Sequence, residues 1–212
     1  MVKSGSKSFV VGVAGGTGAG KSTIVNEILK QLDPEKVSVI QHDSYYKHRP
    51  ELSFEERTKI NFDHPDSLDT NLLVEHLSLL ISGKNVEIPV FHHFTKYLRD
   101  SRTKKVESRP ILIVEGILVF NDKKLRDLMN LKVFVDVPPD LRFIRRLKRD
   151  LFEHGRSVES VTKQYLATIR PMHEYYVEPS KIHADIFIPM GGHDRQALDL
   201  MVSLLQILQA KH

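Results

Sequence analysis

A glycine-rich stretch near the start of the chain, Phe9 to Thr23, has the residue types of a phosphate-binding loop. Gly15, four further residues and then Gly20-Lys21-Ser22 fit the pattern G-x-x-x-x-G-K-[ST]. Glycines let consecutive backbone N–H groups turn toward an anion, and the helix that follows adds the positive end of its dipole. Lys21 can reach the terminal phosphates, and the Ser22 hydroxyl can ligate Mg²⁺. An ordinary strand-to-helix turn is the alternative, but the stretch predicts a nucleoside triphosphate site. The residues expected to bind the nucleotide are Gly15, Gly16, Thr17, Gly18, Ala19, Gly20, Lys21, Ser22 and Thr23.

Two carboxylates follow apolar stretches that are typical of strands. Asp43 comes shortly after the apolar residues 37–40, and Glu115 comes directly after 111–114. Ligands of an open parallel sheet bind beyond the carboxyl ends of its strands, so both side chains are expected beside the phosphate loop. There Asp43 can accept the proton of a hydroxyl that attacks a γ-phosphate, although a helix-capping role is the alternative. Glu115 can ligate Mg²⁺ directly or through water.

A run of cations lies on a predicted helix between Leu141 and His154, and Arg156 follows it. Such a run is often a solvated helix face. In a protein that transfers a phosphoryl group, however, arginines can clamp the triphosphate and a closing lid can exclude water. We therefore predict a lid over about 141–157, in which Arg149 contributes to catalysis. The cations are Arg142, Arg145, Arg146, Lys148, Arg149 and Arg156.

The elements that position these residues alternate between strands and helices. Strands predicted at 9–13, 37–40, 111–114, 133–136 and 184–189 indicate an α/β P-loop NTPase fold with a doubly wound, mainly parallel five-stranded sheet. Residues 86–91 are predicted to form an edge strand because they contain Pro89, and residues 100–110 a solvated turn. Together they suggest a small β-hairpin-like appendage over about 84–110. Helices are expected at 20–32, 72–81, 124–129, 141–154 (capped by Asp140), 158–170 (kinked or interrupted near Pro171, before 174–177) and 195–210. We expect residues 1–212 to form a single domain.

Composition excludes several other classes of protein. The chain of 212 residues is 41% hydrophobic, lacks cysteine and shows no signal-peptide or membrane-spanning stretch, which favours a cytoplasmic protein without a membrane partner. The formal net charge of +4 is mild, and anionic phosphate substrates explain it as well as nucleic acid does. We therefore expect no nucleic-acid partner.

Many stretches in order along the chain resemble the uridine kinase (uridine–cytidine kinase) family of P-loop kinases. They include GVAGGTGAGKST, QHDSYY, NFDHPDS, IVEGILVF, DLRFIRRLKRD, QYLATIRPMH and ADIFIP. The resemblance implies a kinase that phosphorylates the 5′-hydroxyl of uridine and cytidine in pyrimidine salvage, with ATP (or GTP) and Mg²⁺. It implies Asp43 as the base, Lys21 on the phosphates, and Ser22 and Glu115 on Mg²⁺. Members are commonly homotetramers, so a homo-oligomer is expected.

The same resemblance implies a nucleoside site. Tyr46 would lie near the acceptor, and Asp63 would bind the ribose hydroxyls. The base would lie among Phe91, Phe94 and Tyr97. The remaining residues implied at this site are Arg146, Arg156 and Gln164.

Three departures from the family pattern affect this site. The loop Phe91-His92-His93-Phe94 is one residue longer than usual. Tyr97 stands where the family has a histidine, and its phenol oxygen could accept from the cytosine amine, which suggests a bias toward cytidine. His154 replaces a lid arginine, which predicts that phosphate affinity falls as pH rises through about 6.5.

Other readings of the same residues remain open. A phosphoribulokinase-like or pantothenate-kinase-like enzyme would share the loop and the lid, but the stretch Asn61-Phe62-Asp63-His64-Pro65 favours a nucleoside acceptor. A GTPase switch would need an Asn-Lys-x-Asp motif, which the sequence lacks. The adjacent His92 and His93 could bind a metal, but in a strand they point to opposite faces. Stacking against a base is the better explanation of that aromatic segment.

Overall fold

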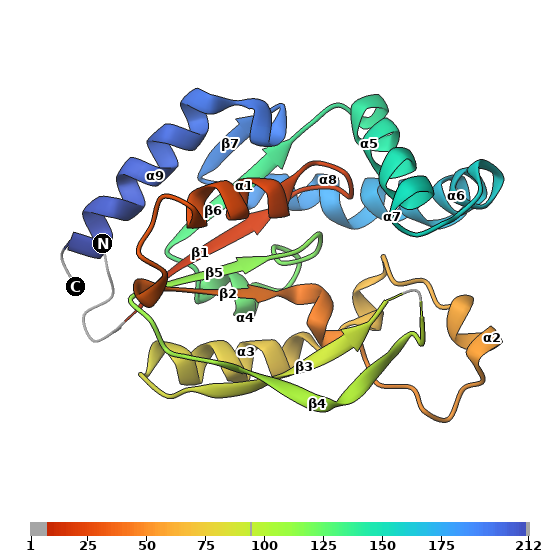
Figure 1. Cartoon of the computed structure of the whole chain (residues 1–212), viewed down its shortest axis with the longest axis horizontal. Helices are drawn as coiled ribbons and strands as arrows, with labels where there is room; N and C mark the ends of the chain where they lie inside the picture. The colour runs from red at the N-terminus through yellow and green to blue at the C-terminus, as the bar shows by residue number, and fades with distance from the viewer. Residues whose placement is uncertain (1–7, 94, 211–212) are drawn as a thin grey trace.

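A parallel sheet forms the centre of the computed structural model, which describes residues 8–93 and 95–210. Its order is β2 (Val37–Gln41), β5 (Ile111–Glu115), β1 (Phe9–Ala14), β6 (Leu131–Asp136) and β7 (Ile186–Pro189). Every neighbouring pair of these strands is parallel (Figure 1). β1 and β5 are apolar on both faces because helices cover both sides of the sheet. The predicted fold class and five-stranded sheet are therefore confirmed.

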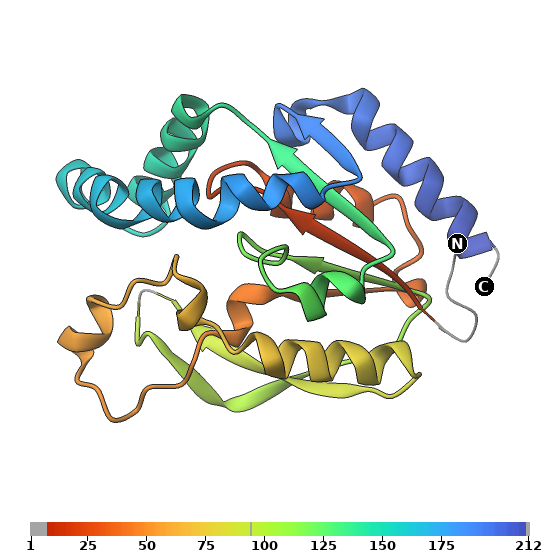
Figure 2. The ribbon, with the colours of Figure 1, turned by 180° about the vertical axis from the view of Figure 1, so that it is seen from behind.

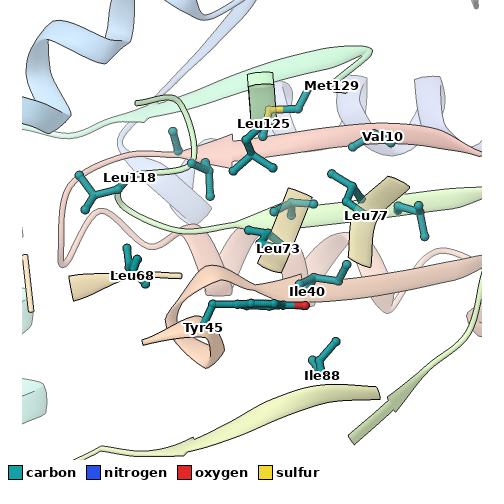
Figure 3. Close-up of a cluster of buried hydrophobic side chains, with 14 of the residues drawn as sticks. Val10, Ile40, Tyr45, Leu68, Leu73, Leu77, Ile88, Leu118, Leu125 and Met129 are labelled. Atoms are coloured by element: carbon teal, nitrogen blue, oxygen red, sulfur yellow. The ribbon is translucent and has the colours of Figure 1, made fainter. Parts of the chain in front are cut away.

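Two helical layers cover the sheet. On one face lie α1 (Lys21–Leu29) and α9 (Arg195–Ala210), and the predicted apolar stripe of α9 joins α1 and β5 in one buried cluster. On the other face lie α3 (Thr70–Ile81), α4 (Lys123–Asp127) and the helical segment 158–180, all visible from behind in Figure 2. Figure 3 shows Leu73 and Leu77 of α3 among the buried apolar side chains on this second face of the sheet. No helix in the described ranges is long and apolar enough to cross a bilayer.

The appendage is a two-stranded antiparallel ribbon of β3 (Val86–His92) and β4 (Leu98–Val106). The prediction of a solvated turn over 100–110 is thus wrong for residues 100–106. Most residues of β4 are exposed and polar on both faces, so the strand lacks the alternation that would reveal it in the sequence. The register shifts between Pro89 and Phe91, as expected where proline cannot donate to the ladder.

Two helical predictions also need correction. α2 (Phe54–Thr58) lies in a stretch for which no helix was expected, although Ser53 and Glu56 form a capping box there. α5 (Pro139–Phe152) begins with Pro138 at its N-cap, so Asp140 lies in the first turn and is not the cap.

The segment after the lid stays helical through its prolines. α6 (Val158–Gln164), capped by Ser157, is followed by a π-helical turn at Tyr165–Ile169 and by α7 (Arg170–Met172). A second π-helical turn at His173–Val177 leads into α8 (Glu178–Ser180). Of the kink or interruption expected near Pro171, the interruption does not occur: each proline comes just after a π-helical turn, and the chain stays helical through both.

The buried side chains of α3 should contribute much of the stability of the core on this face of the sheet. Leu77 is fully buried, so Leu77→Ala is expected to lower the free energy of unfolding by about 2–5 kcal/mol, measured by chemical denaturation. Leu200→Ala is the matched control, because the Leu200 side chain on α9 is 73% exposed. Equal losses in the two variants would contradict this assignment of the core.

Candidate active site

The phosphate loop follows β1 and ends where α1 begins. Gly18 has a φ of +75°, and a side chain there would overlap the Arg142 carbonyl, so glycine is required. Lys21 Nζ donates to the carbonyls of Gly15 (3.0 Å) and Gly16 (3.2 Å) across the loop. Burial lowers the pKa of Lys21, while the Asp43 and Glu115 carboxylates oppose that shift. The lysine thus lies between the loop and both predicted carboxylates.

Glu115 ends the buried strand β5 and faces the start of α1. Its Oε1 accepts hydrogen bonds from Ser22 Oγ (3.1 Å) and Gln41 Nε2 (3.0 Å). Its Oε2 is buried and has no hydrogen-bond partner among the described residues. A buried carboxylate oxygen left unpaired beside a serine hydroxyl fits the oxygen ligands that Mg²⁺ prefers. Ser22 and Glu115 could therefore hold this ion, and Gln41 would orient the carboxylate.

One cavity of about 610 Å³ collects the residues with predicted phosphate chemistry. Asp43 enters it from the 3₁₀ turn His42–Tyr45 that directly follows β2, as its position at a strand end predicted. Gln41 and His93, which we did not predict at a phosphate site, lie there as well. The residues that line it are Thr17, Gly18, Gly20, Lys21, Ser22, Thr23, Gln41, Asp43, His93, Glu115, Gly116, Ile117, Arg145, Arg146 and Arg149.

Aromatic rings gather next to Asp43, where the acceptor base is expected. Tyr46 is buried and packs edge-on against Phe62, with ring centroids 5.0 Å apart. The Tyr97 ring stacks on Phe62 with centroids 5.5 Å apart, and the Phe91 ring centroid lies 5.1 Å from that of Tyr46. Tyr97 adopts a left-handed backbone conformation with a φ of 50°, an uncommon geometry for a bulky residue. Phe94 lies outside the described residues.

Burial also changes the ionisation of the polar groups beside these rings. It raises the pKa of Tyr46 well above the ordinary value, with Asp43 and Asp63 adding to the effect, so the phenol stays neutral. Burial likewise raises the pKa of Asp63 to about 6, and the Asp43 charge adds to this while Arg146 opposes it. Asp63, Arg146 and Asp43 are therefore close enough to influence one another.

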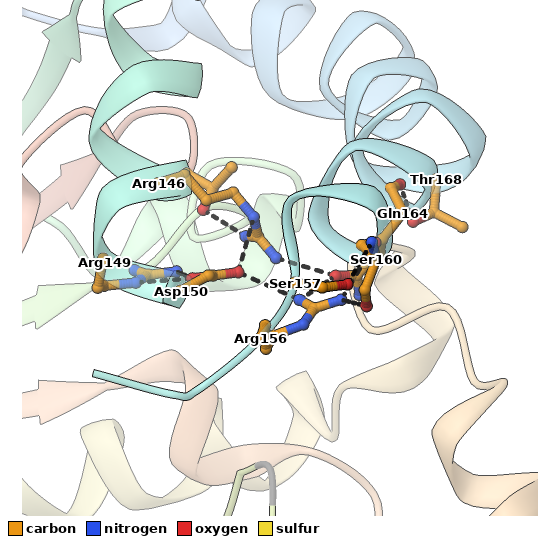
Figure 4. A network of polar contacts seen from close by, with 9 residues as sticks. Arg146, Arg149, Asp150, Arg156, Ser157, Ser160, Gln164 and Thr168 are labelled. Carbon is orange, nitrogen blue, oxygen red and sulfur yellow. Dashed lines mark hydrogen bonds and ion pairs between the residues drawn. The ribbon is translucent and has the colours of Figure 1, made fainter. Parts of the chain in front are cut away.

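A buried carboxylate organises the lid (Figure 4). Asp150 on α5 is fully buried and accepts from Arg149 (2.9 Å) and Arg156 (3.1 Å), while Arg146 Nε lies 3.5 Å away. Gln164 Oε1 accepts from both Arg146 (3.2 Å) and Arg156 (2.6 Å). The sequence pattern did not single out Asp150, because an acid within a basic helix is typical of an ordinary surface ion pair.

Arg146 connects the lid with the phosphate loop. Its Nη1 donates to the Thr17 hydroxyl at 2.9 Å, while its Nη2 donates to Gln164. Tyr46, Asp63, Phe91, Tyr97, Arg156 and Gln164 do not line the 610 Å³ cavity. The structure therefore divides the predicted residues between a phosphate cavity and a neighbouring polar and aromatic region, with Arg146 contacting both.

A second cavity, of about 1010 Å³, lies behind the loop, and of the cations predicted for the lid it contains Arg142. Its wall includes Arg142, whose Nε donates to the Val137 carbonyl (2.9 Å) and whose Nη2 lies 3.0 Å from His173 Nε2. A side chain at Gly16 would collide with the Arg142 guanidinium. Arg142 thus supports the back of the loop and does not face the phosphate cavity.

The chain is similar to known proteins over nearly its whole length. The chain is 49% identical over 198 residues to a uridine kinase of Chloroflexus aurantiacus, covering 93% of this chain and 94% of that protein. It is 48% identical over 205 residues to a uridine kinase of Clostridium botulinum, covering 97% and 99% of the two chains.

Solved structures support the fold. A putative fructose transport system kinase from a Silicibacter species superposes with a TM-score of 0.68 at 20% identity, covering 89% of this chain and 93% of that one. Phosphoribulokinase from Rhodobacter spheroides superposes with a TM-score of 0.65 at 14% identity, covering 86% and 70%. The model of the phosphoribulokinase / uridine kinase family matches residues 10–197. With most of its length matched in this way, the chain belongs to the phosphoribulokinase / uridine kinase family.

Proposed function

We propose that this protein transfers the γ-phosphoryl group of ATP (or GTP) to the 5′-hydroxyl of uridine, and also of cytidine. The observation that carries this proposal is that the phosphate loop, Asp43, Glu115 and Arg149 share one cavity. The cavity adjoins an aromatic cluster that contains Tyr46 and Tyr97. The 49% identity to a protein named uridine kinase supports the choice of acceptor.

In this reaction Asp43 accepts the proton of the 5′-hydroxyl while that oxygen bonds to the γ-phosphorus. The bond from the γ-phosphorus to the β–γ bridging oxygen breaks, and the nucleoside diphosphate leaves. Lys21 and Arg149 lie where negative charge develops on the phosphates. Ser22 and Glu115 would hold Mg²⁺, which when bound neutralises phosphate charge.

Acceptor binding is proposed on the neighbouring aromatic side. Asp63 would accept hydrogen bonds from the ribose 2′- and 3′-hydroxyls, and the rings would enclose the base. Arg146 and Arg156 would contact the sugar and phosphate. The residues proposed to contact the nucleoside are Tyr46, Asp63, Phe91, Phe94, Tyr97, Arg146, Arg156 and Gln164.

The family resemblance supports further proposals about the whole protein. We propose a single kinase domain over residues 1–212, with a lid over about 141–157 and an appendage over about 84–110. A homotetramer that acts in pyrimidine salvage in the cytoplasm is proposed on the same basis.

Measuring Mg²⁺-ATP consumption with uridine, cytidine, ribulose 5-phosphate and pantothenate, each offered separately, tests the proposed function. Turnover with a pyrimidine nucleoside is expected. Turnover with ribulose 5-phosphate or pantothenate alone would refute the proposal and assign the protein another acceptor within the family.

Tyr97 should bias the enzyme toward cytidine, because its phenol oxygen can accept from the amine at position 4 of cytosine. The ratio of kcat/KM for cytidine to that for uridine is expected to exceed one, and to fall in Tyr97→His. A ratio at or below one in the unmodified enzyme would sink this prediction.

Replacing the proposed base should slow the chemical step selectively. Asp43→Asn is expected to lower kcat by about 10²–10⁴-fold, since the amide cannot take up the proton, while ATP binding stays nearly unchanged. Single-turnover kinetics and calorimetric titration with ATP measure the two quantities. A kcat within a few-fold of the unmodified enzyme would remove Asp43 from the mechanism.

Nucleoside binding should weaken below about pH 6, because the pKa of Asp63 is raised to about 6 and only its carboxylate accepts from two hydroxyls. At one pH unit below this value the KM for uridine should be roughly ten-fold higher than at neutral pH. Asp63→Asn should give a high KM with no such dependence.

The effect of Asp63 on folding has the opposite sign. A carboxyl with a raised pKa contributes stability below its unfolded value, and this contribution is lost as pH rises through about 6. Protonation of Asp63 therefore does not itself destabilise the fold as pH falls. A KM independent of pH between 5 and 7 in the unmodified enzyme would contradict the assignment of Asp63.

A further inference from the structure

A hydrogen bond next to Asp63 joins the loop that contains this residue, here called the acceptor loop, to the helical segment 158–180. His64, the residue after Asp63, places its Nε2 2.8 Å from the Tyr176 hydroxyl oxygen. The two rings meet edge-on with centroids 5.0 Å apart. Neither residue lines the phosphate cavity, and the proposed mechanism uses neither.

The direction of this hydrogen bond follows from the other ring nitrogen. The Asp66 backbone N–H donates to His64 Nδ1 at 3.1 Å, so Nδ1 is the acceptor and the neutral ring carries its proton on Nε2. Nε2–H therefore donates to the Tyr176 oxygen. The Ser67 hydroxyl also donates to the carbonyls of His64 (2.7 Å) and Phe62 (3.2 Å), which closes the turn that contains Asp63.

Tyr176 is anchored to the core of the protein. Its ring packs against the buried core under the sheet, and its carbonyl accepts from Asn121 Nδ2 at 3.0 Å. It lies in the π-helical turn His173–Val177, and such turns are frequent at functional sites. The turn around Asp63 is thus joined to segment 158–180 by the side-chain pair His64 and Tyr176, while Phe62 packs the same turn against Tyr46 and Tyr97.

The same helical segment also contacts the other parts of the site. Gln164 accepts from the lid residues Arg146 and Arg156, and His173 lies 3.0 Å from Arg142 behind the phosphate loop. The Tyr176 contact therefore fixes the acceptor loop relative to the element that also positions the lid.

We propose that Tyr176 and His64 are positioning residues for the acceptor: their hydrogen bond holds Asp63 where it binds the nucleoside. This inference rests on the proposed function. The bond acts on binding of the acceptor in ground state and transition state alike, so its loss raises the nucleoside KM and leaves kcat and the ATP KM unchanged.

Tyr176→Phe removes the hydroxyl and keeps the ring. The uridine KM is expected to rise about 3- to 10-fold, the range that a net hydrogen bond supports. Tyr175→Phe is the matched control, because this neighbouring tyrosine is 74% exposed, and its KM values should not change. A Tyr176→Phe enzyme with an unchanged uridine KM, or with an equal rise in the ATP KM, would overturn the proposal.

A second variant tests whether the two residues act as a pair. His64→Asn keeps an acceptor for the Asp66 N–H, as in an Asx turn, but is too short to reach Tyr176. It should raise the uridine KM as Tyr176→Phe does, and the double variant should rise no further. Multiplied effects in the double variant would show that the two side chains act independently and would refute the pair.

The unmodified enzyme separates this inference from the proposed function. If it does not turn over either pyrimidine nucleoside, the proposed function fails and the positioning role fails with it. If it is active, only the KM comparison decides. Thermal unfolding of each variant supplies the structural readout: a lower Tm with unchanged uridine KM would assign the bond to folding alone.

Discussion

The arrangement of the lid depends on one buried negative charge. Asp150 has no exposed surface, and the guanidinium groups of Arg146, Arg149 and Arg156 converge on it. Without this carboxylate the three cations would repel one another, because like charges in a partly buried site are poorly screened. A buried carboxylate left without its partners would be equally unfavourable. Each side of the cluster therefore requires the other, and together they hold the lid arginines beside the phosphate loop.

Cations and carboxylates also lie close together in the rest of the site. Arg146 joins Asp150 and Gln164 to the Thr17 hydroxyl of the loop, while Lys21 lies between the loop carbonyls and the carboxylates Asp43 and Glu115. Cationic groups and carboxylates thus line the same 610 Å³ cavity. A preorganised arrangement of this kind stabilises developing charge without reorganising during the reaction. It suits the transfer of a phosphoryl group between two oxygens.

Local patterns predicted those parts of the fold and site that are encoded over short stretches. The loop Gly15–Ser22, the buried strands, and the placement of Asp43 and Glu115 at strand ends follow from residue type and periodicity alone. β4 could not be found in this way, because its stability comes from pairing with β3 and not from an apolar face. Asp150 and the stacking of Tyr97 on Phe62 depend on contacts between residues that tertiary structure brings together. Such roles become visible only once the helices and loops are placed.

The two π-helical turns of segment 158–180 have a geometric consequence for how the parts of the site face one another. A π-helical turn contains about one residue more than an α-helical turn, so it rotates everything beyond it by roughly 100° about the axis. Gln164 precedes the first of these turns and Tyr176 lies within the second. The π-helical turns therefore set the angle about the helix axis between Gln164, which contacts the lid, and Tyr176, which contacts the acceptor loop. A single α-helix of the same sequence could not direct both side chains to their partners at once.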